Sequence, residues 1–326
     1  MQNVLAHVRR LWPDWKVLTP LPFVVYPLIL FLRGDHRWDY IAVMVVVPFL
    51  AYTNATTKKL YVGAYPIGLV GLIFDSMRYV RDVGITADRV HLCDLRASEM
   101  RFFSVTLDGR QTTYHDWLQA HATPLLDGYF AIPYGTFIFA SFAFAFYLYR
   151  RDFARMQRFT WAFLAMNVTA FVTYHLYPAA PPWYYHAHGC TVDLGSHASE
   201  GPNLARVDQW LGVAYFGGMY GRSSDVFGAI PSLHCAYPLL IFLEGWSVFT
   251  VGWRVASGIF AASMCVAAVY LDHHWVTDVF VGLTYGGLAF VVGRVLSARW
   301  RRAGAPEIAA GAAEARSARE SGGLTR

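Results

Sequence analysis

Eight stretches of mostly apolar residues, each close to the length of a membrane-crossing helix, recur along this chain of 326 residues. A helix needs about 20 such residues to cross the hydrocarbon core of a bilayer, and about 17–25 are tolerated. The predicted spans are 17–32, 38–53, 60–76, 129–149, 159–177, 229–248, 253–271 and 276–297. The sequence therefore predicts an all-α fold, a polytopic membrane helix bundle of about eight transmembrane helices.

Composition excludes most other classes of protein. Hydrophobic residues make up 56% of the chain and charged residues 15%, whereas soluble globular proteins have about 45–50% and about 25%. The formal net charge of +5 comes from dispersed residues and forms no basic stripe, so nucleic-acid binding is disfavoured. The last five spans are nearly free of charge between their ends, which argues against an ion path through the membrane.

The spacing of the spans suggests three regions. A two-span N-terminal extension is expected in 1–59, and a six-span membrane core in 60–298. Two long loops, 77–128 and 178–228, contain Gly, Pro, His and charged residues that would not lie in lipid. The tail 299–326 is rich in Ala, Gly, Glu, Arg and Ser, and we expect it to be disordered and cytoplasmic.

The basic residues predict the orientation. Most of the 27 Lys and Arg residues fall in segments on the same side as both termini, and the segment 150–158 (RRDFARMQR) is the strongest signal. The excess of Lys and Arg in cytoplasmic loops predicts a multi-pass protein of the plasma (inner) membrane with both termini in the cytoplasm. Of the 12 histidines, all except His7 then lie on the outer side. This distribution reflects either loop composition or a polar site facing outwards.

Cysteine and histidine residues in the long loops leave two questions open. Cys93 and Cys190 lie in different outer loops, where an oxidising compartment would allow a disulfide, but the sequence gives no distance between them. His186, His188, Cys190 and His197 are close in sequence, yet their spacing fits no standard zinc pattern. We therefore expect neither a metal nor another cofactor.

Two motifs place ionisable groups at the predicted outer membrane surface. The segment 227–240 (FGAIPSLHCAYPLL) contains His234, and 270–282 (YLDHHWVTDVFVG) contains His274 and Asp278. Since residues four apart share a helix face, Asp278 is expected to hold one nitrogen of His274 and leave the other free. That is the arrangement of an oriented nucleophile, and His234 is then the candidate general acid. A structural His–Asp hydrogen bond is the alternative.

These motifs resemble those of the type 2 phosphatidic acid phosphatase superfamily, and in particular its inositol phosphorylceramide synthase branch. In that branch PSLH is followed by YLxHHxxxD at the start of a helix. The matching residues here are Pro231, Ser232, Leu233, His234, Tyr270, Leu271, His273, His274 and Asp278. The upstream segment 173–185 (TYHLYPAAPPWYY) is similar to the proline-rich segment of the branch. The resemblance covers about 173–285 and implies that the six-helix core in 60–298 is phosphatase-like and catalytic.

The resemblance implies a phosphohistidine mechanism. His274 would attack phosphorus, Asp278 would orient it and balance its charge, and His234 would protonate the departing alkoxide. In the second half-reaction His234 would act as base on an alcohol or on water, without a metal. The implied function is a lipid phosphotransferase whose partners are a phospholipid donor and a lipid alcohol acceptor. A lipid phosphate phosphatase is the alternative, and a non-enzymatic membrane transporter is a more remote one.

The sequence also departs from the general superfamily pattern. Ser and Arg are expected seven and six residues before the nucleophile, where this chain has Ala267 and Ala268, and the proline-rich segment lacks the expected Lys and Arg. A monoester dianion needs more stabilisation of negative charge than a diester monoanion, so the missing cations favour a phosphodiester donor. Arg222 is the preferred replacement, with Arg78 or Arg81 as alternatives. Arg222 is equally well explained as an interfacial, snorkelling side chain.

Four further residues are candidates for substrate binding. They are Ser232, His175, Tyr177 and Trp183. His175 is equally well explained as a histidine that ends a helix. Trp183 is better explained by the aromatic belt at a membrane surface, with a lipid groove as the alternative.

Overall fold

The structure is a computed structural model that describes residues 2–81, 83–195, 202–220 and 226–322. Side chains are described for residues 3–81, 83–195, 203–220 and 226–299. The α-helices of the described residues are α1 (Gln2–Leu11), α2 (Pro22–Leu32), α3 (Trp38–Tyr52), α4 (Ala55–Ser76), α5 (Cys93–Phe102), α6 (Tyr114–Ala120), α7 (Pro124–Arg151), α8 (Phe153–Leu176), α9 (Pro182–His188), α10 (Pro202–Leu211), α11 (Tyr215–Tyr220), α12 (Leu233–Gly245), α13 (Val251–Tyr270) and α14 (Val276–Gly322). Short 3-10 helices cover Trp15–Leu18, Met77–Tyr79 and Ala87–Arg89, and the strands are β1 (Val105–Leu107) and β2 (Arg110–Thr112).

Each predicted span corresponds to a helix, namely α2, α3, α4, α7, α8, α12, α13 and α14, which confirms the expected fold class. Five segments are long and apolar enough to cross a membrane: Trp15–Leu32, Ala55–Tyr79, Pro124–Arg151, Val251–Tyr270 and Val276–Arg299. The helices α3 and α12 are apolar but shorter. The helix α8 is long but less apolar, because it is enclosed by protein and buries polar groups such as Thr160 and Asn167.

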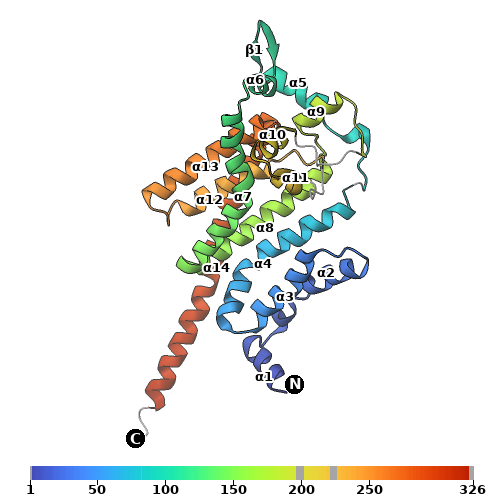
Figure 1. Ribbon diagram of the computed structural model, residues 1–326. Coiled ribbons are helices and arrows are strands. Elements are labelled where there is room, and N and C mark those ends of the chain that lie inside the picture. The colour runs from blue at the N-terminus through green and yellow to red at the C-terminus, as the bar shows by residue number, and fades with distance from the viewer. Residues whose placement is uncertain (1, 82, 196–201, 221–225, 323–326) are drawn as a thin grey trace.

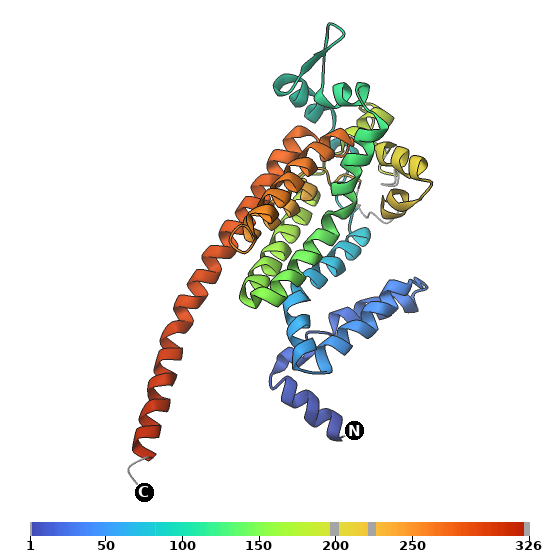
Figure 2. The same ribbon diagram turned by 60° about the vertical axis from the view of Figure 1, so that its left-hand side comes forward.

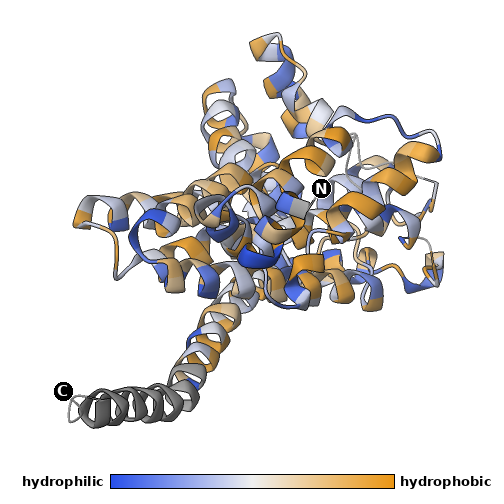
Figure 3. Ribbon diagram, turned by 90° about the horizontal axis from the view of Figure 1, so that it is seen from below, coloured by the Kyte–Doolittle hydropathy of each residue, from blue (hydrophilic) through white to orange (hydrophobic). Residues whose placement is uncertain are grey.

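The bundle is built around α12 and α8 (Figure 1). The helix α12 packs against α14, α13, α7 and α8, while α4 packs along α8. The helices α2 and α3 pair with each other, and α3 meets the core through α4. Seen from below, the helices of the bundle are largely hydrophobic along their length (Figure 3), as expected for surfaces that face lipid. The division into an extension and a core remains a prediction.

The helices α12 and α14 approach each other unusually closely. A Cβ atom added at Gly282 would lie 2.2 Å from the Ser232 carbonyl oxygen, and one at Gly286 would lie 2.9 Å from that of Ala236. Two glycines four residues apart allow backbones in membrane bundles to come together in this way. The sequence GLTYG (282–286) carries this signal, which our sequence analysis did not use.

The two long loops contain secondary structure that the sequence analysis did not predict. The strands β1 and β2 form an antiparallel hairpin with Val105 opposite Thr112, at the top of Figure 1. Asp108 and Gly109 connect them with positive φ angles of 49° and 78°, which is the backbone that a two-residue Asp-Gly turn provides. The helices α5, α6, α9, α10 and α11 complete this face of the molecule.

The C-terminal helix is longer than a membrane span. Figure 2 shows α14 continuing well beyond the bundle, and it reaches Gly322. The sequence predicts disorder over 299–326, whereas the structure assigns helix as far as residue 322. The strong helix propensity of Ala, Glu and Arg accounts for this difference.

Candidate active site

The first motif places His234 in the first turn of α12. The peptide bond between Ile230 and Pro231 is cis, and Ser232 is the N-cap residue of the helix. The backbone N–H of Ser232 donates to the carbonyl oxygen of Asp278 at 3.1 Å. This hydrogen bond joins the two motifs directly. The imidazole of His234 is only partly buried, so it remains open to the space beside it.

The second motif crosses the turn between α13 and α14. His273 and His274 lie in the turn itself, two or three residues before α14 begins at Val276, and Asp278 lies in its first turn. Both His274 and Asp278 are buried. His274 is therefore not on the helix, as the spacing rule assumed, although the four-residue spacing still brings its Nδ1 atom to 3.5 Å from Asp278 Oδ2. The same carboxylate oxygen accepts the backbone N–H of Trp275 at 2.9 Å.

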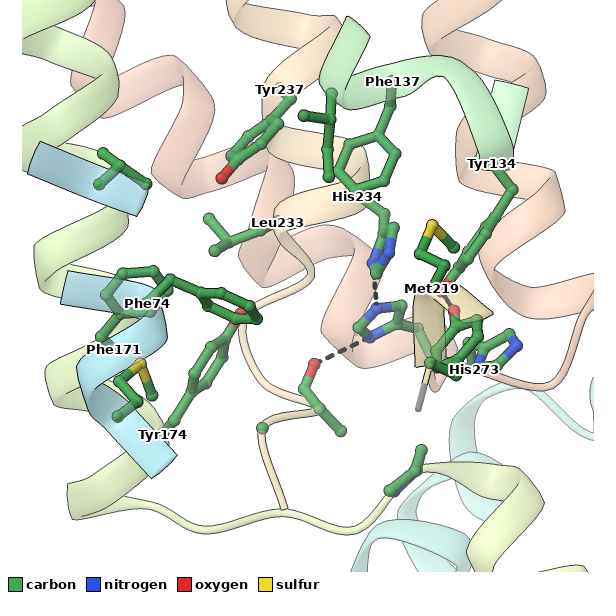
Figure 4. Close-up of a pocket in the computed structure, with 18 of the residues that line it drawn as sticks. Phe74, Tyr134, Phe137, Phe171, Tyr174, Met219, Leu233, His234, Tyr237 and His273 are labelled. Atoms are coloured by element: carbon green, nitrogen blue, oxygen red, sulfur yellow. Dashed lines mark hydrogen bonds between the residues drawn. The ribbon is translucent and has the colours of Figure 1, made fainter. Parts of the chain in front are cut away.

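The hydrogen bonds of His274 define its tautomer. Its Nδ1 atom lies 2.9 Å from the carbonyl oxygen of Ala229. A carbonyl oxygen only accepts hydrogen bonds, so Nδ1 carries the proton and donates it. The Nε2 atom is then the one with a free lone pair, and it lies 2.9 Å from Nδ1 of His234. Figure 4 draws both hydrogen bonds as dashed lines beside the labelled His234.

The proline-rich segment holds Ala229, the hydrogen-bond partner of His274, in place. Ala179 donates to Phe227 O at 2.7 Å and accepts from Ala229 N at 3.1 Å, forming a parallel bridge with Gly228. The neighbouring Ala180 accepts the indole N–H of Trp275 at 2.8 Å. The segment therefore supports both motifs through its backbone, which explains why its position matters even though it supplies no cation.

A cavity of about 380 Å³ opens onto the two histidines. We call it the catalytic cavity. Its walls come from α4, α7, α8, α11 and α12, and most of the side chains are aromatic or aliphatic (Figure 4). Polar lining groups include His234, His273 and His274. Tyr134 stacks on both His234 and His273, with ring centroids 4.3 and 5.0 Å apart.

Cations are scarce around this cavity. Within the part of the chain that the structure describes, the lining contains neither Lys nor Arg. Arg78 instead pairs with Asp75 and Asp35 beside α2 and α3. Arg81 does not contribute to the described lining either. Arg222, the preferred phosphate clamp, lies outside the described residues.

The predicted substrate-binding residues lie in different places. Trp183 is 4% exposed and lines the catalytic cavity. Ser232 is fully buried and joins the motifs through its backbone. His175 and Tyr177 are not part of the lining. Tyr177 ends α8 with a non-helical backbone and stacks on His91. Tyr174, which was not among the predicted residues, lines the cavity instead. Its hydroxyl donates a hydrogen bond to Pro231 O at 2.9 Å.

Residues of the two long loops hold the turn that carries His273 and His274. His186 donates from Nδ1 to Asp272 Oδ2 at 2.6 Å and from Nε2 to Asp116 Oδ1 at 3.0 Å. Asp116 also accepts from Arg96 at 3.0 Å. The hydrogen bonds to Asp116 and Asp272 raise the pKa of His186 to about 9, so it is a cation between two carboxylates at neutral pH. Asp272 adopts a positive φ of 66° directly before His273, a backbone that Asp tolerates better than most residues.

Glu99 of α5 stabilises the start of α14. It is fully buried, and its Oε1 accepts both the backbone N–H and the hydroxyl of Thr277 at 3.1 Å. A carboxylate at a helix N-terminus also interacts favourably with the helix dipole. Glu99 and Asp116 have no local signal in the sequence, because their partners Thr277 and His186 are 178 and 70 residues away.

Cys93 and Cys190 form a disulfide, which settles the pairing that the sequence left open and ties α5 to the segment after α9. His186 is hydrogen-bonded to carboxylates and Cys190 is oxidised, so neither is free for a metal. Among the described residues no group of three or more His, Cys, Asp or Glu side chains is arranged to hold a metal ion. His197 lies outside those residues.

Comparison with known proteins gives consistent matches. A model of the PAP2 superfamily matches residues 106–292. The phosphoinositol dihydroceramide synthase of Bacteroides thetaiotaomicron is 28% identical over 260 residues, covering 78% of this chain and 81% of that protein. The inositol phosphorylceramide synthase of Candida albicans and the catalytic subunit of the Saccharomyces cerevisiae enzyme are each 33% identical, over 39% and 36% of this chain but only 27% and 29% of theirs. No solved structure matches the chain.

Proposed function

The chain belongs to the PAP2 superfamily and is a membrane lipid phosphotransferase, and from this premise we propose that it transfers phosphoinositol from a glycerophospholipid to a ceramide-like lipid alcohol. The names of its relatives motivate the donor head group and the acceptor. The observation that carries the proposal is the 2.9 Å contact between His234 and His274 at an apolar cavity.

In the proposed first half-reaction, the lone pair on His274 Nε2 attacks phosphorus and the bond from phosphorus to the diacylglycerol oxygen breaks. His234 enters as an imidazolium paired with the phosphodiester anion, and its Nδ1 proton passes to the departing oxygen. The substrate phosphorus takes its place between the two rings and replaces their hydrogen bond. Asp278, 3.5 Å from His274 Nδ1, balances the positive charge of the phosphohistidine ring.

In the proposed second half-reaction, neutral His234 accepts the hydroxyl proton of the lipid alcohol at Nδ1. The alcohol oxygen attacks phosphorus, and the bond to His274 Nε2 breaks. The enzyme then returns to its starting protonation state. The apolar lining of the catalytic cavity supports an acceptor with a hydrocarbon chain, because such a surface gains from displacing water with an apolar partner.

The scarcity of cations supports a phosphodiester donor. The described lining of the catalytic cavity has neither Lys nor Arg, and a diester monoanion requires less charge stabilisation than a monoester dianion. We propose Arg222 as the residue that supplies the remaining positive charge. Replacement by Ala should then lower the rate strongly but leave residual activity.

We further propose that the catalytic histidines face the outer side of the plasma (inner) membrane and that both termini are cytoplasmic. The basic segment 150–158 supports this orientation. The disulfide between Cys93 and Cys190 supports it independently, because such bonds persist in oxidising compartments.

The decisive experiment incubates the purified protein with phosphatidylinositol labelled in the inositol ring, with and without an added ceramide. Formation of a labelled ceramide-linked lipid is the expected result. Release of water-soluble inositol phosphate alone, unchanged by ceramide, would instead identify a hydrolase that uses water as the acceptor. If the labelled phosphatidylinositol is neither transferred to ceramide nor hydrolysed, the proposed donor is wrong.

A further inference from the structure

A second cavity, of about 510 Å³, lies between the helices α2 and α3 on one side and α4 and α7 on the other. We call it the N-terminal cavity. Its walls are mostly apolar, with Val43, Val47 and Phe146 among the lining side chains. The mechanism described above makes no use of it.

Polar groups close one end of the N-terminal cavity, close to the end of α4. Asp75 accepts hydrogen bonds from the hydroxyls of Tyr26 at 2.7 Å and Tyr40 at 3.0 Å. Arg37 donates to the same carboxylate at 3.3 Å. The catalytic histidines lie near that same end of the bundle, because α4 and α8 end there while α12 and α14 begin. The N-terminal cavity is therefore polar at the end near the histidines and apolar along the rest of its walls.

The two cavities share part of their lining. Ile67, Gly71 and Phe142 contribute to both. A Cβ atom added at Gly71 would meet nothing within 4 Å, so this glycine leaves open space between α4 and α7. Phe142 is 48% exposed and its side chain contributes to the lining of both cavities.

We propose that the N-terminal cavity binds one hydrocarbon chain of a two-chain phospholipid substrate whose other chain occupies the catalytic cavity, the lipid passing between α4 and α7 at Gly71. The proposal rests on the proposed function, since it assumes that the substrate is a lipid with two chains. Pockets for one ligand span roughly 300–1,000 Å³. The catalytic cavity, at about 380 Å³, is near the lower limit and is small for a whole two-chain lipid.

Blocking variants test this division of the substrate. Val47→Trp fills the N-terminal cavity from α3, and Gly71→Phe fills the passage. The matched controls are Val46→Trp, at a neighbouring side chain that is 49% exposed and outside the lining, and Gly287→Phe, where an added Cβ atom also meets nothing within 4 Å.

The readout is kcat/KM for a two-chain donor and for its one-chain lyso form. A filled cavity resists insertion of a hydrocarbon chain as an overpacked core does, so both blocking variants should lower kcat/KM for the two-chain donor about tenfold. Val47→Trp should leave the lyso donor unchanged, because Val47 lines the N-terminal cavity and not the catalytic cavity. Gly71 lines both cavities, so Gly71→Phe is judged on the two-chain donor alone, and the controls should leave both donors unchanged. An equal loss with both donors in Val47→Trp, or no loss with either donor in both blocking variants, would overturn the proposal.

Photocrosslinking tests the same site without turnover. The probe is a phosphatidylinositol with a diazirine at the end of one chain, and the labelled peptides are mapped by mass spectrometry. Label on the α3 and α4 walls of the N-terminal cavity, lost in Val47→Trp and retained in Val46→Trp, is expected. Label confined to the catalytic cavity would overturn the proposal, as would equal labelling by a choline phospholipid that is not turned over. Because labelling needs no reaction, it separates failure of this proposal from failure of the proposed function.

Discussion

The Nδ1 atom of His234 lies 2.9 Å from the Nε2 atom of His274, although the two histidines are 40 residues apart. Each belongs to a different membrane helix or to the turn before one, and the Ser232 to Asp278 backbone hydrogen bond fixes the two segments together. The acceptor at Ala229 directs the His274 proton to Nδ1. The arrangement therefore presents one nitrogen with a lone pair and one nitrogen with a proton to the same small volume.

Replacement of the proposed nucleophile should abolish the reaction. We expect His274→Ala to lower turnover at least about 10³-fold, since removal of a nucleophile leaves only binding and electrostatic contributions. Acid-labile phosphate on the protein, measured by rapid quench with labelled donor, should disappear as well. Wild-type turnover by a well-folded His274→Ala variant would contradict the nucleophile assignment.

Replacement of the proposed general acid should have a different signature. Loss of proton transfer in His234→Ala is expected to lower the rate about 10²–10⁴-fold with a natural donor. A nitrophenyl phosphodiester has a leaving group that needs no proton, so the first half-reaction, measured as a burst of nitrophenol, should be largely restored in His234→Ala and absent in His274→Ala. The second half-reaction should remain slow in His234→Ala, because it needs His234 as a base. Equal defects with both donors would rule out the acid role.

The carboxylate of Asp278 is expected to balance the positive charge of the phosphorylated His274 ring, and not only to hold that ring in position. Asp278→Asn keeps an oxygen for the Trp275 N–H but cannot balance a phosphohistidine cation. We expect kcat to fall by about 10²–10⁴-fold while KM changes little. The melting temperature serves as the control, and a parallel collapse of stability would indicate that the side chain is mainly structural.

The outer-loop cation should make stability depend on pH. The pKa of His186 is raised to about 9 by its hydrogen bonds to Asp116 and then Asp272, whereas the unfolded value is about 6.5. A raised pKa means that the full stabilisation is present below about pH 6.5 and is lost as the pH rises through about 9.

His186→Gln should therefore destabilise the protein below about pH 6.5 by about 1.5–3 kcal/mol, the range for hydrogen bonds to charged groups, and by less at pH 8. At pH 10 the variant and the wild type should unfold at similar temperatures. The comparison uses melting curves in detergent at pH 6, 8 and 10. A difference that is constant over this range would show that His186 acts through packing instead of charge.

The membrane helices and the two motifs were predictable because each is a local signal. Runs of apolar residues locate α7 and α13 to within a few residues, and PSLH and HHWVTD lie next to the turns that carry the histidines. The four-residue spacing correctly predicts that His274 and Asp278 lie close together. However, His274 lies in a turn, and its Nδ1 atom is closer to the carbonyl oxygen of Ala229 than to Asp278. That backbone acceptor has no side-chain signature in the sequence.

The remaining parts of the site depend on long-range contacts that single-sequence patterns do not contain. Glu99 reaches Thr277 across 178 residues, and His186 reaches Asp272 across 86. His175 and Tyr177 were chosen from their position at a helix end, but the inward-facing side chain is Tyr174, since the end of α8 at Tyr177 changes the direction of the backbone.

The close approach of α12 and α14 provides the last prediction. A Cβ atom at Gly282 would lie 2.2 Å from Ser232 O, so even Gly282→Ala must push the helices apart and stretch the hydrogen bond from Ser232 to Asp278. We expect a loss of about 1–3 kcal/mol of stability, as for other overpacked sites, with a larger loss of turnover because His234 and His274 separate. Gly287→Ala is the matched control on the same helix, where the added Cβ meets open space. If Gly282→Ala melted and reacted like Gly287→Ala, the contact between the two backbones would not be what holds the histidines together.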